Sequence, residues 1–191
     1  MSNGLKNVKP NSIGNLIKSR RTINFYQQKS ISVSILIEAI EIARWAPNHK
    51  KTEPWHFYLL GEEVREKVIR LIVNIKSAGK NDSARDLIKK RLVDIPGWFI
   101  LTSNTSGNKI VQRENYAACC CAAQNIMLYL WDNGIGSKWS TGEVTRDKRL
   151  YELLNINKEE SKVVGLFWYG YPEIVPTQTR IPTKEIFTKL R

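Results

Sequence analysis

The sequence predicts one domain of helices and short strands in mixed order, without the regular strand–helix–strand alternation of a doubly wound sheet. Segments with apolar residues at helical spacing are interrupted at irregular intervals by short apolar runs. A length of 191 residues, with 42% hydrophobic and 25% charged residues, suits a globular chain that builds its core without disulfides. We therefore expect a single domain over residues 1–191, with a flexible N-terminus at 1–11 and an extended C-terminal arm at 172–191.

The first half of the chain predicts four helices and one strand. A serine cap and an apolar stripe at helical spacing mark the second helix, which Pro47 ends. An aromatic and aliphatic run that closes at Gly61 marks the strand, and acidic residues in the first turn mark the helix after it. The helices are expected at 12–19, 32–45, 62–78 and 82–92, and the strand at 55–60.

The second half predicts one long helix among three strands. This helix is apolar on most of its circumference and ends at Asn133 and Gly134. A continuous apolar run at 163–169 predicts a strand in the interior of the sheet. Thr145 is expected to cap a short helix that continues to residue 154. The long helix is expected at 112–131, the other strands at 98–102 and 138–140, and a last turn near 184–190 of an otherwise extended tail.

The chain is strongly basic, with 30 Lys and Arg against 18 Asp and Glu and a net charge of +12. Basic surfaces attract phosphate, so nucleic-acid binding is one interpretation. However, the nine basic residues from Arg65 to Arg91 are interleaved with acidic ones, which is typical of solvated helix faces, and no nucleic-acid-binding motif is present. We therefore expect no nucleic-acid partner, while a basic field can equally attract an anionic small molecule.

No targeting or membrane segment is predicted. The first residues are not followed by the apolar run of a secretory leader, and the longest apolar stretch falls short of the roughly 20 residues that span a membrane. Cys119, Cys120 and Cys121 are contiguous and fit neither a disulfide framework nor a metal-ligand spacing. We interpret them as small apolar residues on a buried helix, and we expect a cytoplasmic protein without a membrane partner.

The sequence also lacks the motifs of common nucleotide-binding and hydrolytic sites. It contains no glycine-rich dinucleotide fingerprint, no P-loop and no nucleophile elbow. The two histidines, His49 and His56, cannot form a metal-binding helix motif, so we expect no metal site. We interpret His56 as a packing or surface residue of its strand, and no side chain stands out as catalytic.

Three polar segments are not explained by core packing. Residues 19–24 place two arginines and a threonine at a helix end, which can hold a phosphate or simply be a solvated basic end. Residues 43–55 form a polar loop between a helix and a strand, in which His49 can bind a ligand or cap its own loop. Residues 134–142 can bring backbone amides close to a ligand, or form only a helix-to-strand turn.

Together these segments resemble the FMN-dependent nitroreductase family, and in particular its small, single-domain members. Arg-Arg-Thr at 20–22 with Tyr26, and the run from Ala43 to His49 followed by Glu-Pro-Trp-His-Phe, are similar to its first two signatures. Residues 134–142, 163–172 and 180–182 are similar to its third block, its last core strand, and the basic residue with proline near its C-terminus.

The resemblance implies an α+β fold of the nitroreductase type, in which a central mixed or antiparallel sheet is wrapped by helices in an intertwined homodimer with FMN at the interface. Arg20, Arg21 and Thr22 would contact the phosphate, ribityl chain or pyrimidine, and Arg180 would reach the phosphate. His49 and Glu53 would come from the other subunit. The implied cofactor-binding residues are Arg20, Arg21, Thr22, Asn24, Pro47, Asn48, His49, Glu53, Trp139, Ser140, Thr141, Gly142 and Arg180.

The implied reaction is a ping-pong transfer of a hydride from NADH or NADPH to FMN, followed by reduction of a nitroaromatic, quinone or related acceptor. Because a flavin carries the redox chemistry itself, the lack of a catalytic triad is expected. Other reactions at the same FMN site, namely ene reduction, dehalogenation or flavin fragmentation, and a redox sensor without turnover, stay open as alternatives.

Two positions depart from the family pattern. Glu53 stands where many members have glutamine, and a carboxylate there would disfavour a negatively charged reduced flavin unless it pairs with Lys50 or Lys51. Asn24 stands where many members carry a second basic residue, which leaves one positive contact to the flavin without a donor. Both departures bear on the flavin potential and on the preferred acceptor.

Overall fold

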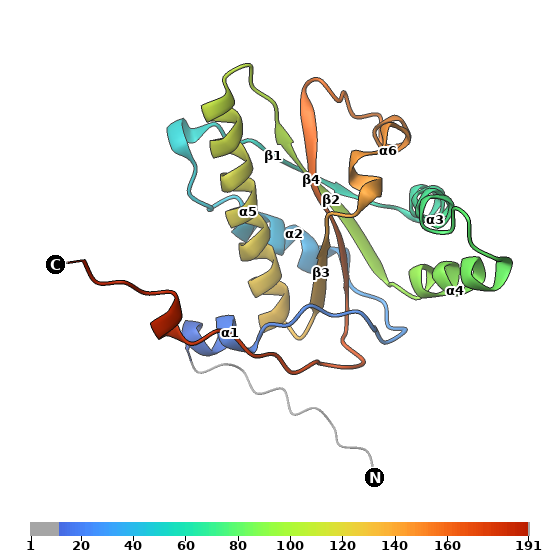
Figure 1. The fold of residues 1–191 in the computed structure, drawn as a ribbon, viewed down its shortest axis with the longest axis horizontal. Helices are drawn as coiled ribbons and strands as arrows, with labels where there is room; N and C mark the ends of the chain where they lie inside the picture. Colours follow the sequence, from blue (N-terminus) through green and yellow to red (C-terminus); the bar gives the residue numbers. More distant parts are fainter. Residues whose placement is uncertain (1–11, 191) are drawn as a thin grey trace, which may run out of the picture.

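The computed structural model describes residues 12–190, which form three layers, with a four-stranded sheet between two groups of helices (Figure 1). Helices α2 (Val33–Ala43) and α5 (Lys109–Asp132) cover one face of the sheet. Helices α3 (Glu62–Lys76), α4 (Asp82–Val93) and α6 (Lys148–Leu153) lie on the other side. The N-terminus at 1–11, expected to be flexible, lies outside the described residues.

The sheet is antiparallel, with the strand order β1-β2-β4-β3. The interior position of β4 confirms the prediction made from its continuous apolar run, because both of its faces are covered. β3 is the edge strand beside which residues from the start of the chain run. The strands are β1 (Trp55–Leu59), β2 (Gly97–Asn104), β3 (Gly136–Ser140) and β4 (Ser161–Gly170).

A β-bulge in β4 determines which core each side chain of this strand enters. The pairing with β2 shifts between Val163 and Gly165, which leaves Val164 as an extra residue. After the bulge, even-numbered side chains such as Leu166 pack toward α3, and odd-numbered ones such as Phe167 pack toward α5. Before the bulge the relation is reversed, since Val163 packs toward α3 and Val164 toward α5.

Local signals set the ends of the two helices on the α5 face. The hydroxyl of Ser32 accepts a hydrogen bond from the amide of Ser34 and caps α2, as the sequence predicts. Asn108 caps α5 by accepting from the amides of Ile110 and Val111, so α5 begins three residues earlier than expected. No helix within residues 12–190 is both long and apolar enough to cross a membrane.

The three consecutive cysteines of α5 are not all buried, so that expectation was wrong for two of them. Cys119 is fully buried, Cys120 is half-buried and Cys121 is exposed. Successive residues of an α-helix are turned by about 100°, so three in a row cannot all face one core.

The helix near residue 150 begins later than predicted. Residues Glu143–Arg146 form a 3-10 turn, and the carboxylate of Asp147, not the hydroxyl of Thr145, caps α6 by accepting from the amide of Arg149. Thr145 is buried instead and donates to the carbonyl oxygen of Gly142 at 2.8 Å. Threonine and aspartate are both favourable caps, and the tight turn that contains Thr145 moves the helix start by two residues.

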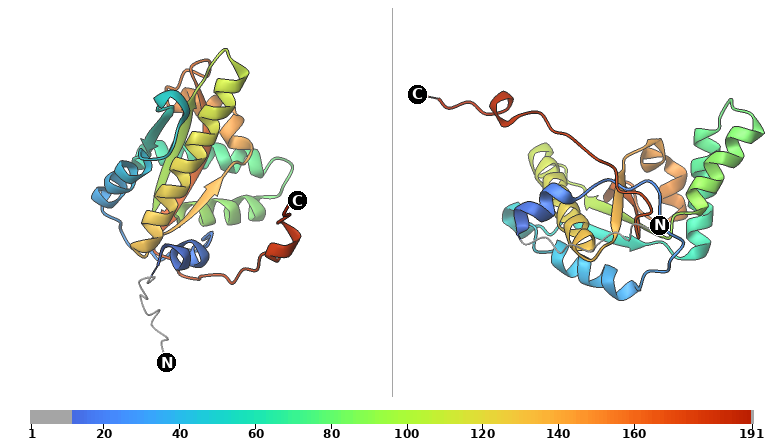
Figure 2. Two further views of the ribbon diagram at one scale, coloured as in Figure 1. Left: turned by 90° about the vertical axis from the view of Figure 1, so that its left-hand side faces the viewer. Right: turned by 90° about the horizontal axis from the view of Figure 1, so that it is seen from below.

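The chain after β4 leaves the body as an extended arm (Figures 1 and 2). Pro172 forms an isolated bridge with Tyr26, which attaches the start of the arm to the body. The one regular turn, at Thr183–Glu185, lies earlier and is shorter than the last turn predicted near 184–190. Ile186, Phe187 and other apolar side chains of the arm are exposed.

Candidate functional site

Two arginines that are distant in sequence lie near enough for their charges to interact beside the end of α1 (Ile13–Ser19). Arg20 follows α1 and is half-buried, whereas Arg180 comes from the C-terminal arm. The pKa of Arg20 is lowered, mainly by burial and then by the positive charges of Arg180 and Arg21. Among the described residues, none of these arginines forms an ion pair with a carboxylate. Positive groups held together in this way favour binding of an anion.

Arg21 is turned back onto the helix end. Its Nη1 donates to the carbonyl oxygens of Lys18 at 2.7 Å and Arg20 at 2.9 Å. These contacts satisfy carbonyl groups that have no partner inside a helix, and the charge suits the negative end of the helix dipole. Arg21 therefore stabilises the end of α1.

The next residues run along the free edge of β3. Thr22 forms an isolated parallel bridge with Ser137, and the amide of Ile23 donates to the carbonyl oxygen of Ser137 at 3.2 Å. Gly136 allows this approach, because a Cβ there would lie 2.3 Å from Cγ1 of Ile23. The structure thus brings the first and third polar segments of the sequence together.

The side chains of β3 alternate between the two faces of the sheet. Trp139 packs toward α5, where its Nε1 donates to the carbonyl oxygen of Val164 at 3.2 Å and its ring stacks on Phe167. Ser140 lies with Lys138 on the α3 side, because alternate residues of a strand share a face. The side chains of Trp139 and Ser140 therefore cannot line the same side of a ligand. The exposed residues Thr141 and Gly142 follow the strand.

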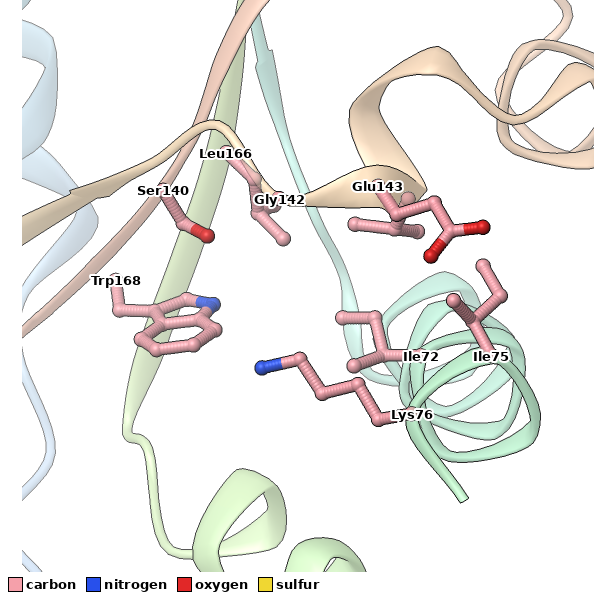
Figure 3. Close-up of a pocket in the computed structure, with 9 residues that line it drawn as sticks. Ile72, Ile75, Lys76, Ser140, Gly142, Glu143, Leu166 and Trp168 are labelled. Atoms are coloured by element: carbon pink, nitrogen blue, oxygen red, sulfur yellow. The ribbon is translucent and has the colours of Figure 1, made fainter. Parts of the chain in front are cut away.

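A pocket of about 230 Å³ lies at the end of β3, between the sheet and α3 (Figure 3). Its walls are mostly apolar, but the hydroxyl of Ser140, the indole nitrogen of Trp168 and the amine of Lys76 are turned toward the same space. Trp168 is only 7% exposed, and its Nε1 has no hydrogen-bond partner among the described groups. A buried donor without a partner costs about 1–3 kcal/mol, which indicates that a ligand or water supplies an acceptor here.

The loop between α2 and β1 has a strained backbone. Lys50, Lys51 and Glu53 have φ values of 56°, 51° and 42°, in the left-handed region that costs a residue with a side chain about 1–2 kcal/mol. Asn48 supports the loop, since its Oδ1 accepts from the amide of Glu53 at 3.1 Å. Such strain is concentrated at ligand clamps and other functional sites.

Several other side chains of this loop are exposed. Pro47 and His49 are exposed, and within residues 12–190 no ion pair joins Glu53 to either neighbouring lysine. His56 is also exposed, with its ring 4.5 Å from that of Tyr58, which agrees with its interpretation as a surface residue. The described residues contain no cluster of histidine, cysteine and carboxylate side chains that could hold a metal ion.

The strained loop and the arginine pair lie at opposite ends of α5 (Figure 1). Near the start of α5, the hydroxyl of Thr52 donates to Oδ1 of Asn115 at 2.9 Å. Near its end, Nε1 of Trp131 donates to the hydroxyl of Ser19 at 3.0 Å. The two anchor positions on α5 are about 24 Å apart at a rise of 1.5 Å per residue. Within one chain, the second polar segment is therefore not brought to the first and third.

Three polar groups near the pocket were missed by sequence reasoning: Lys138, Lys76 and Trp168. Lys138 lies between Asn24, to which its amine donates at 2.8 Å, and the ring of Trp168, whose centroid is 4.8 Å away. Its position two residues before Ser140 in a strand was a usable signal, because such residues share a face. The approach of Lys76 depends on how α3 packs, which no local pattern reveals.

The chain is similar to proteins of one family over most of its length. The sequence model of the Nitroreductase family matches residues 17–171. YfhC of Bacillus subtilis, a protein named for a proposed NAD(P)H nitroreductase activity, is 27% identical over 180 residues, which cover 92% of each chain. A nitroreductase-like family protein from Bacillus cereus has a TM-score of 0.83 and 29% identity, covering 94% of this chain and 96% of that one.

A more distant structure has the same fold. It is a nitroreductase-type protein from Desulfovibrio desulfuricans, solved in complex with FMN, with a TM-score of 0.75 at 17% identity. The match covers 95% of this chain and 98% of that one.

An antiparallel sheet between two helical layers thus has the nitroreductase-like α+β architecture. The chain belongs to the Nitroreductase family. Membership of this family makes it a nitroreductase-like oxidoreductase. The resemblance inferred from the sequence motifs is confirmed, and so is the nitroreductase-like α+β fold of the chain.

Proposed function

We propose that the chain binds FMN beside β3, as a homodimer, and uses NADH or NADPH to reduce a small-molecule acceptor such as a nitroaromatic or a quinone. The observation that carries this proposal is the proximity of Arg20 and Arg180 without a carboxylate partner. The similarity of the fold to a protein solved with FMN supports it.

The arginine pair suits the phosphate of FMN. A guanidinium group offers paired donors together with its charge, and each charge-assisted hydrogen bond contributes about 1.5–3 kcal/mol. A phosphate dianion would also relieve the repulsion that Arg180 exerts on Arg20. Thr22 and Asn24 lie next along the edge strand, where they would contact the ribityl chain.

The pocket at the end of β3 suits part of the flavin ring. Trp168 and Ser140 offer donors to ring acceptor atoms, and Ile72 and Leu166 offer apolar contact to its surface. When bound, FMN supplies the redox chemistry itself, so the protein needs no nucleophile or general base. The residues of the chain bind and orient the cofactor, and the apolar walls exclude water from one side of it.

A second copy of the chain would complete the site. Large apolar side chains are exposed on three separate elements: Trp45 at the end of α2, Ile110 on α5, and the arm, where Leu190 is 86% exposed. Apolar exposure on this scale is typical of an interaction surface. A partner subunit could cover these side chains and bring its own strained loop, with His49 and Glu53, to the arginine pair.

The proposal is tested first by the visible spectrum of the purified protein. We expect the absorption of bound flavin, and we expect it to bleach when NADH or NADPH is added without oxygen. A colourless protein that takes up no added FMN would refute the proposal, and colour without bleaching would favour a sensor or another electron donor. Steady-state oxidation of NAD(P)H with nitroaromatics and quinones then identifies the acceptor class.

The phosphate site is tested by the Arg20→Ala variant. Loss of one charge-assisted hydrogen bond of about 1.5–3 kcal/mol weakens FMN binding roughly 10- to 150-fold. Arg70→Ala, an exposed arginine of α3, is the matched control and should bind FMN as the wild type does. Equal affinity of Arg20→Ala and wild type would contradict the assignment of the phosphate site.

The shared site is tested by mixing two differently disabled subunits. His49→Ala and Arg20→Ala proteins should each retain FMN poorly, whereas mixed dimers regain one intact site, because each subunit supplies the residue that the other lacks. Flavin content after unfolding and joint refolding measures the recovery. No recovery would indicate that each site is built within one chain.

A further inference from the structure

We propose that Lys138 supplies the positive charge that faces the flavin ring of FMN, in place of a basic residue at position 24. This inference rests on the proposed function, because it names a further contact of the cofactor proposed above. The contact that carries it is the hydrogen bond from Nζ of Lys138 to Oδ1 of Asn24, at 2.8 Å. The positive charge of Lys138 on β3 is thereby held beside position 24, where the side chain is the uncharged amide of asparagine.

The fold fixes where this amine lies. Lys138 is paired with Trp168 across β3 and β4, and its amine lies 4.8 Å from the centroid of the indole ring. Paired residues of neighbouring strands project to the same face, and an amine over an indole ring is held by a cation–π interaction. Lys138 therefore points to the α3 side of the sheet, next to the pocket at the end of β3.

The carboxylate that lines the pocket beside Lys138 belongs to Glu143. Within residues 12–190, neither Lys138 nor Lys76 of α3 forms an ion pair with a carboxylate. The pKa of Lys138 is lowered, mainly by burial and then by the charge of Lys76. Two amines from different elements, one of them half-buried, would be stabilised by an anionic ligand between them.

The pocket adds an independent requirement for hydrogen-bond acceptors. The indole nitrogen of Trp168 is buried without a partner, and Figure 3 shows it turned toward the same space as the hydroxyl of Ser140 and the amine of Lys76. A ligand that fits has carbonyl-type acceptors and carries negative charge on or beside them. The pyrimidine half of a flavin ring meets both conditions once the flavin is reduced.

A positive charge beside the flavin ring affects binding of the reduced and the oxidised cofactor differently. Transfer of two electrons and one proton from NAD(P)H to FMN yields NAD(P)⁺ and leaves one additional negative charge on the flavin ring. A nearby ammonium group stabilises that charge, whereas it interacts weakly with the neutral oxidised ring. Lys138 should therefore strengthen binding of reduced FMN more than binding of oxidised FMN.

The test is the midpoint potential of bound FMN, measured by equilibration with a reference dye, in four proteins. These are wild type, Lys138→Met, the double variant Lys138→Met/Asn24→Lys, and Lys89→Met. Lys89 is an exposed lysine of α4 that lines no described pocket, so its variant controls for the loss of one positive charge. The affinity for oxidised FMN, measured on the same samples, reports whether the site is intact.

We expect Lys138→Met to lower the preference for reduced over oxidised FMN roughly tenfold, about 30 mV for a two-electron couple. The double variant should restore the potential, because a lysine at position 24 returns the charge to the same place, and Lys89→Met should match wild type. An unchanged potential in Lys138→Met overturns the inference. So does a shift that Asn24→Lys fails to reverse, or an equal shift in Lys89→Met. A wild-type protein that binds no FMN refutes the proposed function itself.

Discussion

Replacing Gly165 by alanine should destabilise the protein, because this glycine of β4 leaves room for the indole ring of Trp139. A Cβ at position 165 would lie 2.0 Å from Nε1 and 2.3 Å from Cδ1 of that ring, and 3.1 Å from Cε2 of Phe167. Non-bonded atoms do not approach to 2.0 Å, and both backbones are held by the pairing of β3 with β4. The indole ring therefore has to move.

The expected loss follows from the contacts that the ring gives up. Its Nε1 donates to the carbonyl oxygen of Val164, and such a hydrogen bond contributes about 1 kcal/mol. Its stacking on Phe167, with ring centroids 5.4 Å apart, contributes about 0.5–1.5 kcal/mol. Strain from forcing an extra carbon into a packed core adds about 1–3 kcal/mol. We expect the free energy of unfolding to fall by about 2.5–5.5 kcal/mol in total.

Urea denaturation followed by tryptophan fluorescence measures this change, at one protein concentration because a dimer unfolds in a concentration-dependent way. With a urea dependence of about 2–3 kcal/mol per molar, the midpoint should fall by roughly 1–2 M. Gly107→Ala is the matched control, because nothing lies within 4 Å of a Cβ built there. A Gly165→Ala protein within about 0.5 kcal/mol of wild type would refute the reasoning that Trp139 is fixed against Gly165.

Three further predictions concern the core, the dependence of stability on pH under acid conditions, and the reactivity of a thiol. Leu130 is fully buried, so Leu130→Ala should lower the free energy of unfolding by about 2–5 kcal/mol in the same titration, and a near-wild-type value would contradict its place in the core. A hydrogen bond from Arg149 holds the pKa of Asp147 at about 2, below its ordinary value of 3.8, so this contribution is present above pH 3.8 and is lost as the pH falls toward 2. Asp147→Asn should therefore flatten the stability profile in that range, and because its partner Arg149 is exposed and the ion pair is screened by water, the effect at neutral pH is at most about 1 kcal/mol. Burial raises the pKa of Cys119 to about 11, so mass spectrometry should detect its alkylation at pH 8 only after urea unfolds the protein, and labelling of the native protein would contradict this.

Most helices and strands could be predicted from the sequence because their signals are local. The Ser32 cap of α2 and the apolar run of β4 are examples, since each depends on residues within a few positions of one another. Local signals failed to predict the start of α6, where two residues that both favour helix caps lie close together. Thr145 and Asp147 are both favourable caps. Because Thr145 is part of a 3-10 turn, Asp147 caps the helix.

The candidate site could be predicted only in part, because its residues meet through the tertiary fold. The proximity of Arg20 and Arg180 depends on the path of the arm. No local pattern predicts it, and only the family resemblance assigned both arginines to one phosphate. The separation of the His49 loop from Arg20 follows from the length of α5, which the sequence did predict. The approach of Lys76 to Lys138 required knowledge of which side of the sheet α3 covers.

The bulge in β4 divides this strand into two stretches with opposite alternation of side chains. Before Val164, odd-numbered side chains of β4 face the α3 core, and after it they face the α5 core. The one extra residue therefore reverses which side chains face which core. Deleting one residue after the bulge would exchange the side chains of the two cores along the rest of the strand, including Trp168 at the pocket. Deleting Val164 itself would remove the bulge and leave the residues on both sides facing the cores that they face now. The tolerance of β4 to single-residue deletions should thus change abruptly at one position.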